Sequence, residues 1–193
     1  MTTVYSNSFF HPAEYEKHRV APATARAGNV IGGGDWANDR LVPDIMRAII
    51  NGEKVLIRNP LAIRPWQHVL EPLTGYLILA EKLYKEGSGF AGAWNFGPDY
   101  DDAKNVGWIA EQLCARTNHT AGIEIDKGKQ PHEANILKLD CSKAKTHLHW
   151  HPRWNLESSL DRISGFITCY KQKGDLLQYC SEEIITYLSY TGR

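Results

Sequence analysis

The sequence lacks a charge imbalance, a long apolar run and a recognisable export signal. Lys plus Arg and Asp plus Glu both number 22, so no overall positive field is present to attract nucleic acid or an anionic membrane. The longest apolar stretches, such as residues 76–80, are far shorter than the roughly 20 residues that cross a bilayer. The first residues show no basic segment followed by an apolar core. We therefore expect a cytoplasmic protein that binds neither nucleic acid nor membranes.

Cysteine motifs and internal repeats are also missing. The four cysteines occur without a Cys-x-x-Cys pair and fall in different predicted elements, which predicts reduced thiols rather than a disulfide or zinc framework. No period of solenoid length is present. The 193 residues are enough for a real core, because a chain of this size buries roughly 70% of its unfolded surface.

Apolar periodicity and turn residues predict strands alternating with helices, which indicates an α/β fold. No long run of β-α-β units precedes the first strand, so we expect a sheet that is open at one side. The expected strands are residues 20–31, 54–58, 93–96, 122–126 and 136–140. The expected helices are residues 39–51, 70–84, 105–116, 156–173 and 175–190, with a short helix capped by Ser142.

A glycine run, Gly32 to Gly34, follows the first strand and satisfies G-x-G-x-x-A. A dinucleotide-binding fingerprint also needs an acid at the end of the next strand, to hold the ribose hydroxyls. The next strand ends in Arg58, and Glu53 lies before it. The pattern therefore favours a turn over a phosphate-binding loop.

Two further patterns resemble functional motifs by spacing alone. Tyr100 and Lys104 have the Tyr-x-x-x-Lys spacing of short-chain dehydrogenases, in which one helical turn places the ammonium beneath the phenol. The glycine and proline just upstream predict a loop or a first helical turn at Tyr100, so we expect a chance match. His147, His149 and His151 alternate as metal ligands on a strand could, but they cross a helix end and are expected to be surface or turn residues.

Three separated polar residues point to a ligand site. Asn29 and Asn95 stand at or near the ends of predicted strands, and Arg64 stands in a predicted loop before a helix. Ligands of open α/β sheets bind beyond the carboxyl ends of the strands. Two amides and a guanidinium there would suit a sugar diphosphate, because arginine grips phosphate oxygens with two parallel hydrogen bonds.

Around these residues the sequence closely resembles the CDP-glucose 4,6-dehydratases, a family of the extended short-chain dehydrogenase/reductases, the NAD-dependent epimerase/dehydratase superfamily. The resemblance covers essentially the whole chain. It is carried by residues 26–36 (Arg-Ala-Gly-Asn-Val-Ile-Gly-Gly-Gly-Asp-Trp), 57–76 (including Arg-Pro-Trp-Gln-His-Val), 93–98, 131–134, 137–144 and 150–154.

The resemblance implies that residues 1–193 are the C-terminal half of such an enzyme. The last elements of a Rossmann-type parallel sheet would interleave with a smaller mixed α/β substrate-binding lobe, and the N-terminal NAD-binding portion would be absent. The family converts CDP-glucose to CDP-4-keto-6-deoxyglucose with bound NAD, in deoxysugar and surface-polysaccharide biosynthesis. The catalytic Tyr-x-x-x-Lys would precede Met1, so this chain alone is expected to be inactive. The family also implies a homodimer for the full-length enzyme.

The family's sugar-nucleotide contacts can be carried over onto matching positions. Asn29, Arg64 and Asn95 match residues that contact the sugar diphosphate, and Gly28 is expected to approach the nicotinamide. The remaining candidates are Arg40 and Leu41 at a helix start, Leu56, Ile57 and Arg58 beside the base, and His132 and Glu133, where dTDP- and UDP-sugar relatives often place a second diphosphate arginine. His149 replaces a glycine that relatives often have at a left-handed helix end, which predicts slight strain.

Two alternatives remain open. One is a related dTDP- or UDP-sugar dehydratase or epimerase, against which the Arg-Pro-Trp-Gln-His-Val motif argues. The other is a truncated, non-catalytic remnant that binds a nucleotide sugar weakly or only associates with another chain.

Overall fold

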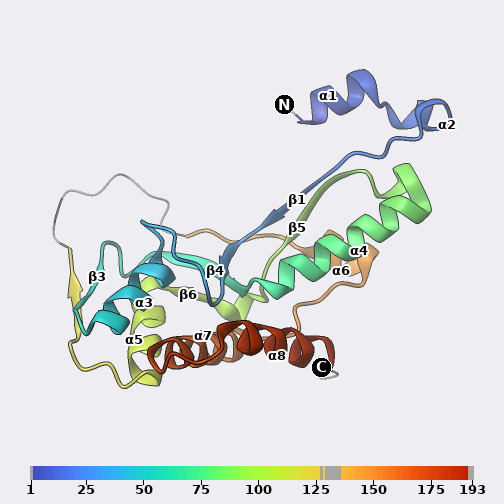
Figure 1. Ribbon diagram of the computed structural model, residues 1–193. Coiled ribbons are helices and arrows are strands. Elements are labelled where there is room, and N and C mark those ends of the chain that lie inside the picture. Colours follow the sequence, from blue (N-terminus) through green and yellow to red (C-terminus); the bar gives the residue numbers. More distant parts are fainter. Residues whose placement is uncertain (1, 127, 129–135, 191–193) are drawn as a thin grey trace.

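The computed structural model describes residues 2–126, 128 and 136–190 (Figure 1). Strands and helices alternate along most of the chain, as the periodicity predicts, and the fold is α/β with parallel strand pairs. The strands are β1 (Ala23–Ala27), β2 (Asn29–Ile31), β3 (Val55–Ile57), β4 (Ile63–His68), β5 (Gly92–Phe96), β6 (Ala103–Asn105) and β7 (Ile123–Ile125).

The helices begin and end close to the expected positions, since polar caps and glycines mark their ends. Asn155 and Asp175 each cap the helix that follows, and Gly52 ends another in the left-handed conformation (φ 72°). The helices are α1 (Thr2–Phe9), α2 (Tyr15–His18), α3 (Leu41–Asn51), α4 (Leu70–Glu86), α5 (Val106–Arg116), α6 (Ser142–Leu148), α7 (Leu156–Lys171) and α8 (Leu176–Leu188), with 3-10 turns at Pro12–Glu14, Gly87–Phe90 and Tyr100–Asp102.

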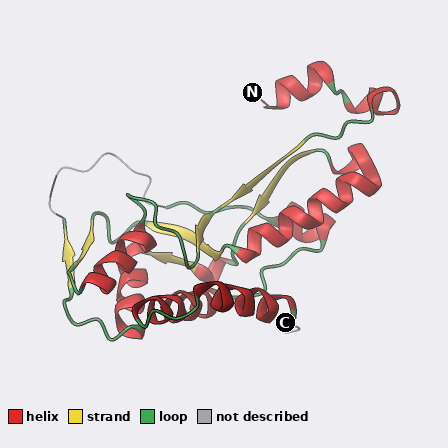
Figure 2. Cartoon of the chain, viewed as in Figure 1, coloured by secondary structure: helices red, strands yellow, loops and turns green. Residues whose placement is uncertain are grey.

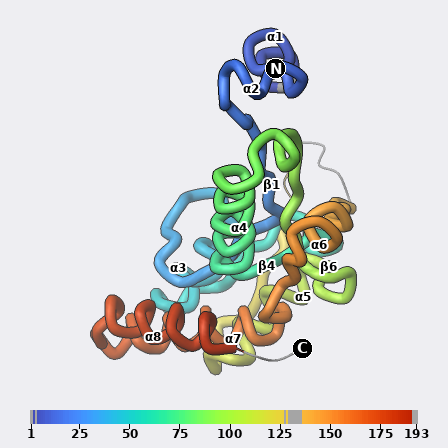
Figure 3. Tube along the Cα trace, turned by 90° about the vertical axis from the view of Figure 1, so that its right-hand side faces the viewer, coloured from blue at the N-terminus to red at the C-terminus, as the bar shows by residue number. Residues whose placement is uncertain are grey.

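The strands form three small sheets within the described residues. β1 pairs in parallel with β5, and β3 pairs in parallel with β7. β4 lies between β2, which is parallel to it, and β6, which is antiparallel. Figure 2 shows α4 alongside β1 and β5, and α3 and α5 beside β3. α1 and α2 lie at the opposite end of the molecule from α7 and α8 (Figure 3).

Four sequence-based expectations were wrong. The expected strand 20–31 is divided at Gly28, and its two parts pair with different partners. Arg64 lies on β4 rather than in a loop. Residues 136–140 form no strand, because only Ile136 makes an isolated bridge, and Ser142 is the first residue of α6 rather than its cap.

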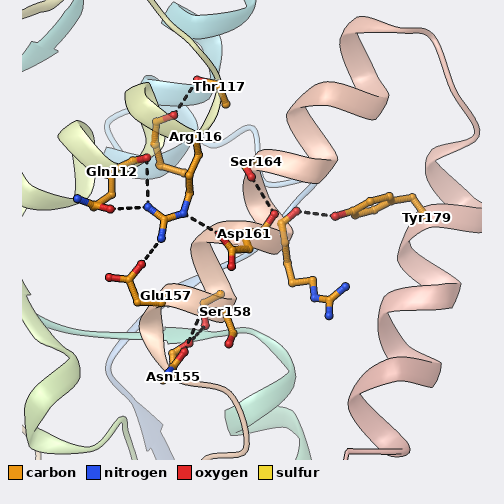
Figure 4. Close-up of polar contacts among 12 residues, drawn as sticks. Gln112, Arg116, Thr117, Asn155, Glu157, Ser158, Asp161, Ser164 and Tyr179 are labelled. Atoms are coloured by element: carbon orange, nitrogen blue, oxygen red, sulfur yellow. Dashed lines mark hydrogen bonds and ion pairs between the residues drawn. The ribbon is translucent and has the colours of Figure 1, made fainter.

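The larger core lies between α3, α5, α7 and the strands β2, β3 and β4. A polar clamp joins α5 to α7 at its surface (Figure 4). Arg116 of α5 donates from Nε to Asp161 Oδ1 at 2.8 Å and also pairs with Glu157, both on α7. Tyr179 of α8 donates its hydroxyl to the Arg162 carbonyl at 2.7 Å, which fixes α8 on α7.

The smaller core lies where α4 and α6 pack on β5. Phe96 of β5 is completely buried and contacts the Trp150 ring edge-on, at 5.1 Å between centroids. A Cβ added to Gly75 of α4 would lie 2.2 Å from Phe96 Cδ1. Glycine at this position therefore lets the helix approach the strand closely.

A buried carboxylate joins α4 to the C-terminal part of the chain. Glu71 is 0% exposed. It accepts hydrogen bonds from the Arg153 and Trp154 backbone N–H groups, at 2.9 and 2.8 Å, and from the Tyr187 hydroxyl at 2.8 Å. Burial raises the pKa of this carboxyl above its ordinary value of 4.5, while these donors act to lower it.

No helix in the described part of the chain is both long and apolar enough to cross a membrane. The four cysteines are free thiols, and burial raises the pKa of the Cys114, Cys141 and Cys180 thiols.

Gly75→Ala is expected to lower the free energy of unfolding by about 1–3 kcal/mol, even after the roughly 1 kcal/mol that alanine gains in helix propensity. The added methyl group would overpack the buried Phe96 ring. Urea denaturation measures the change. Gly89→Ala is the control, because no atom lies within 4 Å of its added Cβ. Equal stability of the two variants would contradict the close approach of α4 to β5.

The pH dependence of stability tests the Glu71 environment. Because the folded protein binds the Glu71 proton more tightly than the unfolded chain, its stabilising contribution is complete below about pH 4.5 and is lost as the pH rises through the folded-state pKa. The free energy of unfolding of the wild type, relative to Glu71→Gln, should therefore fall as the pH rises above 4.5. Urea titrations across this range measure the difference. A difference that grew with pH would show that the three donors outweigh burial.

Candidate functional site

Two adjoining hollows lie along β2, which begins just after the carboxyl end of β1, and at the carboxyl end of β3. Open α/β sheets bind ligands beyond the carboxyl ends of their strands. The β2 hollow, of about 440 Å³, is lined by residues 28–32, Asp35, Ala37, residues 40–43 and Trp66. The β3 hollow, of about 270 Å³, is lined by Asn29, residues 39–41, Asp44, residues 56–59, Arg64, Trp66 and Val106. Asn29, Arg40, Leu41 and Trp66 belong to both linings, so the two hollows adjoin one another at these residues.

The pairing of β2 with β4 builds the floor of both hollows. Asn29 lies opposite Trp66 in the parallel register. Arg64 and Trp66 are two residues apart on β4, so their side chains are on the same face of the strand. The Trp66 indole donates to the Lys104 carbonyl at 2.9 Å, which fixes the ring. Arg64 is only 6% exposed and donates to its neighbour's carbonyl, Ile63 O, at 2.9 Å.

The two hollows differ in charge. The β3 hollow has three arginines, Arg40, Arg58 and Arg64, against two aspartates. Arg40 also directly precedes α3, whose N-terminal N–H groups attract anions. The β2 hollow has only the shared Arg40 and one carboxylate, Asp35. The β3 hollow therefore suits phosphate groups, and the β2 hollow suits a neutral group rich in hydroxyls.

An ion pair crosses the β3 hollow from one wall to the other. Arg58 follows β3 and donates to Asp39 Oδ1 at 2.8 Å, while Asp39 lies in the loop before α3. Asp39 has a left-handed backbone (φ 58°), which an aspartate tolerates better than most residues. Both side chains remain more than half exposed, at 59% and 73%, so an incoming anion can compete for Arg58.

The structure brings most of the predicted residues together. Gly28 lines the β2 hollow. Seven line the β3 hollow: Asn29, Arg40, Leu41, Leu56, Ile57, Arg58 and Arg64. Their roles stay predictions.

Four of the predicted residues need separate comment. Ile57 is 1% exposed and belongs to the larger core, so it offers the hollow little more than its backbone. Asn95 lines neither hollow, and its amide donates to the Asp140 carbonyl at 3.0 Å. The other two candidates, His132 and Glu133, lie outside the described residues.

The lining residues that sequence reasoning did not name as candidates include Asp35, Asp39 and Trp66. The signal for Trp66 was its place two residues after Arg64, which becomes informative only once residues 63–68 are known to form a strand. Pro65 hid that strand, because a proline inside an apolar run argues against a central position. Asp35 and Asp39 lie in an exposed loop, where sequence alone gives no sign that either residue lines a hollow.

The glycine run after β2 serves packing. A Cβ on Gly33 would lie 2.4 Å from the Phe166 ring of α7, and one on Gly32 would lie 3.1 Å from Val69 Cγ1. These glycines therefore allow α7 and the start of α4 to approach the end of β2. This packing agrees with the expectation that the run is not a phosphate-binding loop.

The other two motif-like patterns also lack functional geometry. Tyr100 is 71% exposed in a 3-10 turn, and Lys104 lies on β6 with its ammonium 5.8 Å from the Trp108 ring centroid. No helical turn joins this pair. His149 has the predicted left-handed backbone (φ 51°) at the end of α6. Within the described residues no group of histidines, cysteines and carboxylates could hold a metal ion.

Comparisons with known proteins agree with this architecture. No family model matches the chain. CDP-glucose 4,6-dehydratase of Salmonella typhimurium (strain LT2) is 50% identical over 193 residues, which are 100% of this chain and 54% of the relative. The chain thus spans about half the length of the curated relative that it matches.

Solved structures show the same fold at lower identity. The dTDP-glucose 4,6-dehydratase of Bacillus anthracis, in complex with NAD, has a TM-score of 0.64 and 18% identity over 88% of this chain and 51% of its own. The UDP-glucose 4-epimerase of Thermotoga maritima, with UDP-glucose, has a TM-score of 0.67 and 20% identity over 86% of this chain and 52% of its own. The chain is therefore a homologue of CDP-glucose 4,6-dehydratase, with the Rossmann-type fold of about half of a nucleotide-sugar epimerase or dehydratase.

Proposed function

We propose that this chain supplies the nucleotide-sugar-binding part of a CDP-glucose 4,6-dehydratase, a lyase that forms CDP-4-keto-6-deoxyglucose. The observation that carries the proposal is the pair of adjoining hollows, one rich in arginine and one nearly neutral. The identity of 50% to a dehydratase of that name supports CDP-glucose as the substrate.

The residues that line the two hollows indicate the orientation of the bound ligand. Arg40, Arg58 and Arg64 would bind the diphosphate in the β3 hollow, because guanidinium groups take phosphate oxygens bidentately. Leu56, which is 56% exposed on that wall, would contact the cytosine. The hexose would then occupy the β2 hollow, where the Asn29 amide and the Asp35 carboxylate can bind sugar hydroxyls.

The described residues do not by themselves fit NAD, the cofactor of this reaction class. The absence of a side chain at Gly28 is already required by packing, since a Cβ there would lie 2.5 Å from the Pro65 carbonyl oxygen. The glycines after β2 pack against Phe166 and Val69. We therefore assign NAD to the half of the enzyme that this chain does not match. On this proposal the chain binds and orients the sugar and is inactive alone.

Competition binding tests the substrate. The isolated chain should bind CDP-glucose more tightly than dTDP-glucose or UDP-glucose in isothermal titration, and should form no 4-keto-6-deoxy product with CDP-glucose and NAD. Arg58→Met is expected to weaken CDP-glucose binding about tenfold, the loss of one charge-assisted hydrogen bond, without changing the thermal midpoint. Tighter binding of dTDP-glucose would favour the related dehydratases, and turnover by the chain alone would refute its dependence on a second half.

Asp39→Asn should have the opposite effect on nucleotide binding. It removes the partner that holds Arg58 and one negative charge from the β3 hollow. We expect CDP to bind about two- to fivefold more tightly at low salt, the size of one exposed ion pair, and the gain to shrink at high salt. Glu81→Gln, which breaks the exposed pair with Lys85 on α4, should change nothing. Weaker binding by Asp39→Asn would show that Asp39 contacts the ligand directly.

A further inference from the structure

We propose that Trp36 is a positioning residue that holds the wall of the β2 hollow against α7, so that it controls binding of the hexose rather than of the nucleotide. The choice of ligand rests on the proposed function. Trp36 itself is in neither lining, while its two neighbours, Asp35 and Ala37, line the β2 hollow.

The wall consists of a loop that has little structure of its own. Residues 32–40 join β2 to α3 without helix or strand, and residues 34–40 are exposed. The loop contributes Gly32, Asp35, Ala37 and Arg40 to the β2 hollow. An exposed loop of this kind keeps one shape only where its residues are fixed by contacts to rigid elements.

The Trp36 side chain makes such a contact with α7. Its ring centroid lies 5.1 Å from that of Tyr170 and 6.4 Å from that of Phe166, with both pairs tilted by 52°. Trp36 is 40% exposed, so much of the ring is covered in this position. Gly33 brings the same loop close to Phe166, because any Cβ there would overlap the ring. The loop is thus fixed to α7 at two points.

The Trp36 backbone is fixed separately by α3. Arg47 donates from Nη1 to the Trp36 carbonyl at 2.9 Å and from Nη2 to the Ala37 carbonyl at 3.2 Å. Arg47 also pairs with Asp44, one turn earlier on the helix. Inside the loop, Asp35 Oδ1 accepts from the Ala37 N–H at 2.9 Å. The ring and the main chain of Trp36 therefore join the wall to two different helices.

The contacts predict a selective effect. The anchored segment around Trp36 lines the β2 hollow through Asp35 and Ala37, whereas the β3 hollow takes only Asp39, Arg40 and Leu41 from this part of the chain. Loss of the Trp36 ring should weaken binding of the hexose in the β2 hollow and leave binding of the diphosphate and base in the β3 hollow unchanged. A residue needed only for overall folding would weaken both ligands equally.

The experiment compares CDP-glucose with CDP by isothermal titration on the whole chain. Trp36→Ala is expected to weaken CDP-glucose binding about five- to tenfold and to keep CDP within twofold. Trp36→Phe, which retains a ring against α7, should restore most of the affinity. Tyr170→Ala, which removes the partner ring instead, should reproduce the split. Tyr84→Ala is the matched control, an aromatic that is 92% exposed on α4. Equal losses for the two ligands, or no loss for either, would overturn the proposal.

A ligand-free measurement separates this proposal from the proposed function. Backbone NMR order parameters of residues 34–38 should fall from the rigid range near 0.85 to below about 0.6 in Trp36→Ala, and remain high in Tyr84→Ala. Unchanged order parameters would refute the positioning role. If the wild type bound neither CDP-glucose nor CDP, the proposed function would fail while the order parameters still decided the role of Trp36.

Discussion

The close approach of Gly28 to Pro65 is the constraint on which the site depends. A Cβ at Gly28 would lie 2.5 Å from a backbone oxygen, which cannot rotate away as a side chain can. At this point the chain stops pairing with β5 and begins to pair with β4. Because this change of partner strand occurs one residue before Asn29, the Asn29 side chain lies opposite Trp66. Both residues line the two hollows. A shift of one residue would point the polar side chains to the other face.

The helices fix the walls around this floor. The start of α3 supplies Leu41, and Arg40 directly precedes it. α7 contacts the loop before α3 through Phe166 and Tyr170. Buried polar contacts then join the C-terminal helices to the end of β4 and to α4. Glu71 holds Tyr187 of α8, and His68 Nε2 lies 2.8 Å from Glu183 Oε1 without the angles of a hydrogen bond. The C-terminal helices therefore help to fix the shape of the site, although none of their described residues lines either hollow.

Much of the fold follows from local sequence. Helices α3, α4, α5, α7 and α8 begin and end close to the expected residues, since each has an apolar stripe and clear stop signals. Strands β3, β5 and β7 are also where β-branched and aromatic residues indicate. The expectations failed where a strand depends on its partners: β4 contains Pro65, and β6 (Ala-Lys-Asn) has no β-branched or aromatic residue. Neither carries a pattern that a single sequence can distinguish from a loop.

The sequence by itself determined which polar side chains are candidates for ligand binding, Asn29, Arg40, Arg58 and Arg64, and the family resemblance that joins them. It could not determine that Asn95 lies away from the hollows, or that Asp39 pairs with Arg58 across one of them. Those facts were decided by the tertiary structure. Strand register and the approach of helices bring together residues distant in sequence, and the side-chain geometry that results is set by packing across the whole core rather than by any local pattern.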